Sequence, residues 1–299
     1  MASINDLATA AVSALAEAPP PRAPPSSLPD SAQNQIDDRH PREPPVARGA
    51  LVVLEGLDRS GKTTQVKLLE QRFVELARKV KVMRFPDRTT PIGQMIDSYL
   101  KSQVDMDDHV IHLLFSANRW EAAKTITSLL SSGVTVLCDR YYHSGIVYSA
   151  AKQNPSLTLS WARAPEVGLP RPDLVLFLDL DESQARLRGG WGGEAYEKAE
   201  MQRRVRELFW GLSLGKIETA SVIAEEGAVG PKEELAVGPP TTQALTGTEY
   251  RFRQEEEDLH VVDASSSVED VAEEIWKVVK ARVEAVERGE VGRAVRKVS

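Results

Sequence analysis

Four residues near position 60 have the types and spacing of a phosphate-binding loop. Gly56 and Gly61 are separated by four residues and are followed directly by Lys62 and Thr63. The glycines let the backbone curl so that successive N–H groups point at phosphate oxygens. The lysine can neutralise the β and γ oxygens of a nucleoside triphosphate, and the threonine hydroxyl can bind Mg²⁺. The pattern predicts nucleotide binding; the alternative is a chance match in a glycine-containing turn.

The sequence on both sides of this loop supports phosphate binding. An apolar run over residues 50–54 is typical of a buried strand, and Val66, Leu69 and Phe73 then recur at helical spacing. A helix that begins at the loop directs the positive end of its dipole at the phosphates. The order strand, loop, helix therefore favours a functional loop over a chance match.

Apolar runs alternate with helical segments along most of the chain. Beyond the first strand, we expect strands at residues 80–85, 134–138, 173–179 and 259–262. Strands that are almost wholly apolar form parallel sheets with helices on both faces. We therefore predict an α/β, three-layer fold of the P-loop NTPase type with a five-stranded parallel sheet. The carboxyl ends of its strands meet at one edge, where a ligand binds.

The residues expected at this edge could bind a phosphorylated substrate. Asp139 ends a strand, where a carboxylate can hold Mg²⁺; the alternative is a simple strand-end residue. Arg88, Arg119 and Arg140 come from different segments, and arginine can bind phosphate through two parallel hydrogen bonds. Phe115 lies one helical turn before Arg119, so the pair could stack on a flat heterocycle and hydrogen-bond its edge. Taken singly, such arginines are typical of surface charges and such an aromatic residue is typical of a core.

The composition is that of a globular protein with irregular segments. The chain has 299 residues, 41% hydrophobic and 27% charged, and its net charge of −7 argues against a nucleic-acid partner. Because apolar runs stay shorter than the roughly 18 residues of a membrane span, we expect no membrane partner. Nine of the 18 prolines lie in residues 1–48, which we predict to be a disordered extension.

The lone cysteine, Cys138, lies in an apolar run, as expected of a buried thiol in a reducing compartment. We expect a cytoplasmic protein and leave nuclear import open.

Five blocks of the sequence, in their order and spacing, resemble the thymidylate kinase family of the eukaryotic type. The blocks are Gly56-Leu-Asp-Arg-Ser-Gly-Lys-Thr63, Arg84-Phe-Pro-Asp-Arg88, Leu113-Leu-Phe-Ser-Ala-Asn-Arg-Trp-Glu121, Asp139-Arg-Tyr-Tyr-His-Ser-Gly145 and Gly168-Leu-Pro-Arg-Pro-Asp-Leu-Val-Leu-Phe-Leu178. The resemblance implies a kinase domain over residues 49–286 and a C-terminal tail over 287–299. Within the domain we expect a lid at about 186–197 and a disordered insertion at about 213–249.

The resemblance also implies roles for the residues of the phosphate loop. Lys62 and Thr63 would hold the phosphates of ATP and Mg²⁺, with Asp139 as a second metal ligand. Arg59 would stabilise the charge of the transferring group, and Asp58 would contact the acceptor near its sugar. The other donor contacts implied are Gly56, Ser60, Gly61, Thr64, Arg186 and Arg188.

For the acceptor nucleotide, the resemblance implies a second set of contacts. Arg88 and Arg140 would bind its phosphate, Phe115 would stack on thymine, and Arg119 would hydrogen-bond the edge of that base. Tyr148 stands where the family crowds the 2′ position of the sugar. The remaining contacts implied are Phe85, Tyr141, Gly145, Tyr196 and Gln202.

The activity implied is phosphorylation of dTMP to dTDP, with ATP as donor and Mg²⁺ as cofactor, for dTTP biosynthesis; the family also implies a homodimer. The alternatives are a kinase for another nucleoside or nucleoside monophosphate, a GTPase-like switch, and a nucleotide-binding regulator without turnover. The sequence contains no Asn-Lys-x-Asp guanine motif, which argues against the switch. A regulator would be expected to lack Arg59, Lys62 or Asp139, and all three are present.

Overall fold

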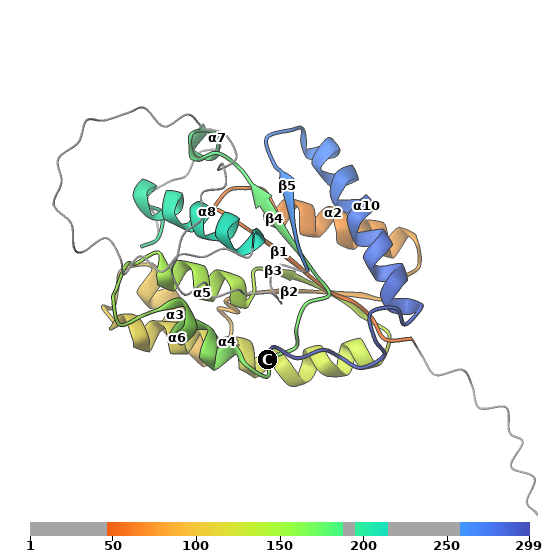
Figure 1. Cartoon of the computed structure of the whole chain (residues 1–299), viewed down its shortest axis with the longest axis horizontal. Coiled ribbons are helices and arrows are strands. Elements are labelled where there is room, and N and C mark those ends of the chain that lie inside the picture. Colours follow the sequence, from red (N-terminus) through yellow and green to blue (C-terminus); the bar gives the residue numbers. More distant parts are fainter. Residues whose placement is uncertain (1–46, 188–194, 215–257) are drawn as a thin grey trace, which may run out of the picture. The chain divides into compact units, whose positions relative to one another are not determined.

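The computed structural model describes residues 47–187, 195–214 and 258–299. Its centre is one sheet of five parallel strands in the order β2-β3-β1-β4-β5, which confirms the predicted fold class (Figure 1). The strands are β1 (Leu51–Gly56), β2 (Val80–Arg84), β3 (Thr135–Asp139), β4 (Leu174–Asp179) and β5 (Leu259–Asp263).

The burial of each strand follows from its place in the sheet. The central strand β1 pairs with β3 on one side and β4 on the other; Val53 lies opposite both Cys138 and Val175. All residues of β1 and β3 are buried, whereas the edge strands β2 and β5 alternate between partly buried and exposed positions. This pattern explains why β1, β3 and β4 are nearly continuous apolar runs and the edge strands are not.

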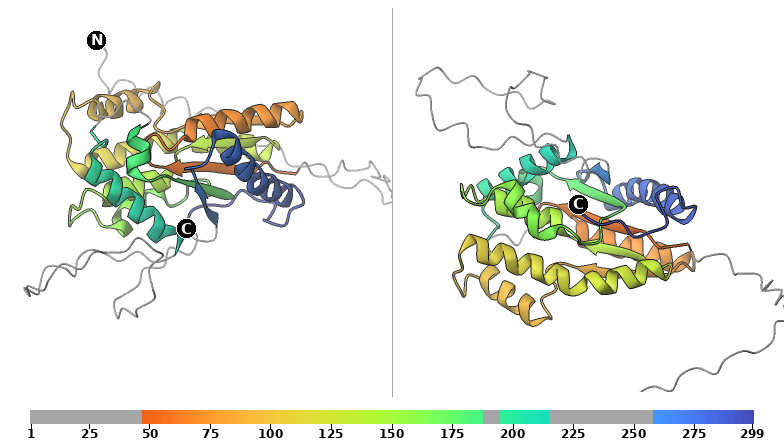
Figure 2. Two further views of the ribbon diagram at one scale, coloured as in Figure 1. Left: turned by 90° about the horizontal axis from the view of Figure 1, so that it is seen from above. Right: turned by 60° about the horizontal axis from the view of Figure 1, so that its bottom comes forward.

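Helices cover both faces of the sheet (Figures 1 and 2). On one face, α2 (Lys62–Glu75) and α10 (Val268–Glu287) pack their apolar stripes against β1 and β4. On the other face, the core is completed by α4 (Asp108–Ser131), α5 (Tyr142–Ala150) and α8 (Ala199–Ser213). The shorter elements are α3 (Pro91–Leu100), α6 (Leu159–Arg163), the 3-10 turn η1 (Ala164–Glu166) and α7 (Glu182–Leu187).

The helix ends follow their capping residues, with two departures from the sequence analysis. The sequence favours helix caps at Asp107 or Asp108 and at Ser267, because these residue types accept hydrogen bonds from the first N–H groups of a helix. In the structure Asp107 caps α4, and Ser267 caps α10 by accepting from the Asp270 N–H. The sequence favours a helix over residues 194–212. In the structure this helix, α8, begins only at Ala199, because Lys198 is still extended, with φ −78° and ψ 135°. The prolines at 165–172 predict a loop before β4, and in the structure this segment begins within the 3-10 turn η1.

The folded unit extends beyond both boundaries expected for the kinase domain. Arg48, assigned to the disordered extension, is buried and forms a bidentate ion pair with Asp173 at 2.8 Å for both hydrogen bonds. At the other end, Val298 of the expected tail is buried and exchanges backbone hydrogen bonds with Gly168 and Leu169. Residues 1–46, 188–194 and 215–257 lie outside the described residues. The disorder expected at 1–46 and at 215–249 therefore stays a prediction, whereas Ser213, at the expected start of the insertion, is the last residue of α8.

Across the described ranges, none of the helices combines the length and hydrophobicity needed to cross a bilayer.

Removing the Arg48 side chain should strongly destabilise the fold. Arg48→Met leaves the Asp173 carboxylate buried without its main counter-charge, a change that costs about 3–5 kcal/mol of unfolding free energy. The measurement is urea unfolding of the full chain. The matched control is Arg78→Met, whose ion pair with Glu287 is half-exposed and should contribute less than about 1 kcal/mol. Equal losses in the two variants would show that the Arg48 pair does not stabilise the fold.

Candidate active site

The loop between β1 and α2 curls around the amino terminus of α2, as the glycine spacing predicts. Gly61 precedes the helix at φ 97°, and Arg59 has φ 67°; both values lie in the left-handed region. Ser60 is buried, and its N–H donates to the Leu57 carbonyl at 3.2 Å. The first N–H groups of α2 and the positive end of its dipole therefore face the loop, an arrangement that binds phosphate.

Lys62 is buried under this loop. Its Nζ donates to the carbonyl oxygens of Leu57 at 2.5 Å and Gly56 at 3.2 Å. Burial, and then the nearby charge of Arg140, lower the pKa of Lys62 to about 7, although Asp58 opposes this. A buried ammonium with so low a pKa is stabilised by any anion that enters the site, so Lys62 favours binding of phosphate.

Thr63 and Asp139 meet where β3 ends beside α2. The Thr63 hydroxyl donates to Asp139 Oδ2 at 2.6 Å. A hydroxyl and a carboxylate oxygen at this distance fit Mg²⁺, which takes oxygen ligands from a few protein groups and otherwise keeps waters and substrate phosphates. The pair therefore has the chemistry expected of the metal ligands predicted from the sequence.

A cavity of about 490 Å³ opens over the phosphate loop. Its floor includes Lys62, Thr63 and Thr64. Its far wall comes from the residues after β5 and from the first turn of α10, with Ala264, Ser266, Val268 and Val271. This cavity has room for a nucleotide with its phosphates at the loop. The sequence analysis missed the far wall, because it lies 200 residues from the loop and carries no motif.

A second cavity, of about 230 Å³, collects the residues assigned to the acceptor. It lies between β2, α4 and α5 and is closed on one side by Tyr196 and Glu197. Its lining includes the predicted acceptor residues Phe85, Arg88, Phe115, Arg119, Arg140, Tyr141, Gly145, Tyr148 and Tyr196. The structure therefore brings together in one cavity residues that the sequence places up to 111 positions apart.

The two cavities share a wall. Asp58, Arg59, Arg84 and Arg140 line both of them. Arg84 was not singled out from the sequence; its Nε lies 3.8 Å from Asp139 Oδ2. Ligands bound in the two cavities would therefore lie on either side of three arginines and one carboxylate. Because arginine can bind phosphate through two parallel hydrogen bonds, this wall favours two negatively charged groups.

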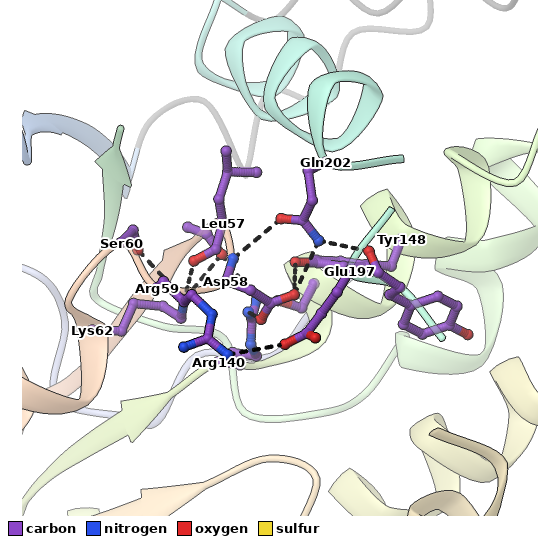
Figure 3. Close-up of polar contacts among 12 residues, drawn as sticks. Leu57, Asp58, Arg59, Ser60, Lys62, Arg140, Tyr148, Glu197 and Gln202 are labelled. Atoms are coloured by element: carbon purple, nitrogen blue, oxygen red, sulfur yellow. Dashed lines mark hydrogen bonds and ion pairs between the residues drawn. The ribbon is translucent and has the colours of Figure 1, made fainter. Parts of the chain in front are cut away.

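Asp58 is the centre of the hydrogen-bond network in this wall (Figure 3). Its carboxylate accepts from Arg140 Nη2 at 2.5 Å, from Gln202 Nε2 at 3.0 Å and from the Tyr148 hydroxyl at 3.4 Å. Gln202 Oε1 in turn accepts from the Asp58 N–H at 3.2 Å. Burial acts to raise the pKa of Asp58, but Arg140 and Lys62 outweigh it and lower that pKa. Asp58 is therefore an anion that arranges the loop, and Gln202 acts through it.

Arg59 reaches from the phosphate loop toward the segment before α8. Its Nη2 lies 3.5 Å from Glu197 Oε1, and Figure 3 shows the two side chains facing each other. Glu197 belongs to the expected lid but was not assigned a role. Arg186, in α7, and Arg188 lie where side chains are not described, so their expected donor contacts stay predictions.

Arg119 is fixed by a buried partner that the sequence analysis missed. Its Nε donates to Glu166 Oε2 at 2.9 Å and its Nη2 to Glu166 Oε1, while both side chains are almost fully buried. A Cβ on residue 145 would lie 2.6 Å from Arg119 Nη2, so Gly145 is required for this close approach. Glu166 carries no motif and lies 47 residues from Arg119, which left no signal to find it.

Arg88 lies at the rim of the acceptor cavity, half-exposed. Its Nη1 pairs with Asp97 Oδ1 at 2.6 Å. Phe85 and Tyr141 form the cavity floor, with ring centroids 5.5 Å apart. For Arg88 to bind the acceptor phosphate as expected, its guanidinium must either hydrogen-bond to Asp97 and the phosphate at the same time or leave Asp97.

Comparison with known proteins identifies relatives of the whole folded unit. A family model described as thymidylate kinase matches residues 54–227. The thymidylate kinase of Schizosaccharomyces pombe is 43% identical over 232 residues, which is 78% of this chain and 92% of the relative. The human thymidylate kinase is 48% identical over 162 residues, which is 54% of this chain and 76% of the relative.

A solved structure agrees with these relatives. The thymidylate kinase of Candida albicans is 29% identical, covers 84% of this chain and 99% of its own, and superposes with a TM-score of 0.63. Its description assigns a broad substrate specificity and a novel structural element to that enzyme.

Proposed function

We infer that this chain, which belongs to the thymidylate kinase family, phosphorylates dTMP to dTDP. The observation that supports this most directly is the shared wall: a cavity over a phosphate loop meets a cavity lined by aromatic residues and arginines. The family implies a nucleotide as phosphoryl donor; we propose that it is ATP, bound over the loop. The acceptor then has its base against Phe115 and Arg119 and its phosphate at the shared wall.

The proposed chemistry is in-line phosphoryl transfer. An oxygen of the acceptor phosphate forms a bond to the γ phosphorus of the donor, and the bond from that phosphorus to the β–γ bridging oxygen breaks. The attacking oxygen is already anionic, so the step requires no strong general base. The protein contributes positioning and charge: Lys62 and Arg59 neutralise the donor, and Arg140 neutralises the acceptor. Asp58 keeps Arg140 in place through their ion pair.

We further propose that Mg²⁺ is held by Thr63 and Asp139, with the remaining ligands from water and the donor phosphates. Bound there, the ion would neutralise charge on the donor. Arg84, 3.8 Å from Asp139, then adds a positive charge on the side of the acceptor.

The aromatic residues of the acceptor cavity support a deoxynucleotide as acceptor. Tyr148 lies beside Arg140, whose guanidinium is 5.3 Å from the ring centroid, and Tyr196 packs at 5.6 Å from the same ring. These aromatic groups restrict the space expected around the sugar. A kinase for another nucleoside monophosphate is the alternative, and the broad specificity ascribed to the Candida albicans enzyme makes a substrate panel the deciding experiment.

The panel should be ranked by kcat/KM with dTMP first. One methyl group in an apolar pocket contributes only about 10–200-fold, so dUMP should follow within that range. UMP should rank far lower, because its 2′ hydroxyl meets the crowding expected at Tyr148. The assay measures the ADP formed from ATP. A reaction without the acceptor nucleotide gives the background rate of ATP hydrolysis. Equal kcat/KM values for UMP and dTMP would exclude the proposed specificity.

Arg59→Ala should lower kcat at least about tenfold, a floor well below the 10³–10⁵ that charge-stabilising arginines contribute in related reactions. Alanine keeps a Cβ at this left-handed position, so the backbone strain is unchanged. Arg59→Lys should recover only part of the rate, because a point charge lacks the planar fork. The KM for dTMP should change far less.

Arg119→Ala is the contrasting variant, in which the loss should fall on dTMP binding more than on turnover. If Arg59→Ala kept the wild-type kcat and substitutions of Arg186 or Arg188 lost it, the catalytic arginine would belong to the lid.

We also propose that the chain forms a homodimer through α4. Val110, Leu113 and Trp120 are 49%, 47% and 42% exposed, and their spacing puts them on one side of this helix. Such a stripe is more than the scattered apolar residues of an ordinary surface. In sedimentation velocity, the wild-type chain should be a dimer and Leu113→Asp should shift it toward monomer. Leu76→Asp, an equally exposed leucine after α2, should stay dimeric; a monomeric wild type at micromolar concentration would contradict the proposal.

A further inference from the structure

The last residues of the chain are bound to the loop that carries Glu166. The Gly168 N–H donates to the Val298 carbonyl at 2.8 Å, and the Val298 N–H donates to the Leu169 carbonyl at 3.0 Å. The Arg171 N–H donates to the Arg296 carbonyl at 2.9 Å. These bonds make a short antiparallel pairing centred on Pro170 and Lys297. The C-terminus therefore behaves as an added strand along residues 168–171.

Two side chains of the tail hold this pairing in place: Val298, which is buried, and Arg296, which is charged. Val298 is 2% exposed and belongs to the same core cluster as α4 and α5. Arg296 Nη2 donates to the Pro172 carbonyl at 2.6 Å and lies 3.2 Å from Asp258 and 3.4 Å from Asp173. Figure 1 shows the C-terminus beside α4, where Lys297 Nζ contacts the Thr127 hydroxyl at 3.4 Å.

The opposite side of the same loop faces α4. Both the Trp120 Nε1–H, at 2.8 Å, and the Ser116 hydroxyl, at 3.3 Å, donate to the Pro165 carbonyl. A Cβ on residue 168 would lie 3.1 Å from the Trp120 ring, and the φ of +99° there requires glycine. The loop is therefore held between α4 and the C-terminal tail, with Glu166 between the two sets of contacts.

From this geometry we propose that residues 296–298 position Arg119 for recognition of the acceptor base, acting through residues 165–171 and Glu166. The inference rests on the proposed function, since it takes Arg119 as the group that reads the base. Glu166 fixes both the Nε and Nη2 of Arg119, so a small movement of residues 165–171 would turn the guanidinium within the acceptor cavity. The tail is a positioning element, since residues 296–298 line neither cavity.

The test compares full-length protein with a chain that stops after Val295. Truncation should raise the KM for dTMP about tenfold, the effect of weakening a hydrogen bond to a charged group. The kcat and the KM for ATP should change less than about threefold, because the donor cavity contains none of these residues. The Kd for dTMP from calorimetry should move with the KM, and the melting temperature is recorded for each variant.

Two point variants keep the test informative if the truncated chain folds poorly. Val298→Ala should raise the KM for dTMP, as truncation does. Val298→Ile, which keeps an apolar side chain at this buried position, should have a KM close to that of the wild type. Val291→Ala is the matched control, because Val291 also precedes the C-terminus but packs against the core on the other face of the sheet and lies outside residues 296–298. It should keep the wild-type KM.

A double-mutant cycle separates positioning from a general loss of stability. In an Arg119→Ala background, Val298→Ala should raise the dTMP KM no further, because its effect passes through Arg119. Additive losses, an unchanged dTMP KM on truncation, or equal losses for dTMP and ATP would each overturn the inference. Failure of the proposed function would instead be seen in the wild-type chain, as absence of dTMP turnover and of dTMP binding.

Discussion

The ion pair between Asp58 and Arg140 joins the two halves of the site. Asp58 belongs to the phosphate loop, and Arg140 follows β3, so their pairing ties the donor side of the sheet edge to the acceptor side. Arg59 and Arg140 both adopt φ 67°, which is uncommon outside glycine and costs about 1–3 kcal/mol at each position. The hydrogen bonds around Asp58, and that from Arg140 to the Gly56 carbonyl, hold this strained geometry. Each arginine of the shared wall is balanced by a carboxylate, since Asp58 pairs with Arg140, Glu197 with Arg59 and Asp139 with Arg84. The wall thus presents several guanidinium groups in positions suited to two phosphates.

Two buried ion pairs hold together segments that lie far apart in the sequence. Arg48 with Asp173 closes the amino end of the sheet, and Arg119 with Glu166 fixes one wall of the acceptor cavity. Removing such charges from water costs several kcal/mol per ion, and well-packed apolar residues could replace them without loss of stability. Their value here is geometric, because a bidentate arginine and carboxylate define both a distance and an orientation. At Arg119 this orientation matters for ligand binding, whereas at Arg48 it matters only for the fold.

The sequence predicted what depends on local pattern and on parallel topology. The phosphate loop, the five strands and the caps at Asp107 and Ser267 follow from spacing within a few residues. The convergence of Arg88, Phe115 and Arg140 follows from the common edge of a parallel sheet together with the family resemblance. Glu166, the wall at 264–271 and the docked tail were not predictable, since each depends on contacts between segments without motifs. The cytoplasmic location and the donor contacts of Arg186 and Arg188 stay predictions.

The outer wall of the acceptor cavity precedes residues 215–257 in the sequence, and the outer wall of the donor cavity follows them. Before this segment, α8 supplies Gln202, which hydrogen-bonds to Asp58 of the shared wall. The same helix packs Phe209 on Phe177 of β4, with ring centroids 4.6 Å apart. After it, the residues that follow β5 and the first turn of α10 supply the wall of the donor cavity, and α10 packs on the other face of the sheet. Each flank is therefore held by its own core contacts. Because the entropy of closing a loop grows only slowly with its length, a long insertion between two such anchored flanks costs the fold little.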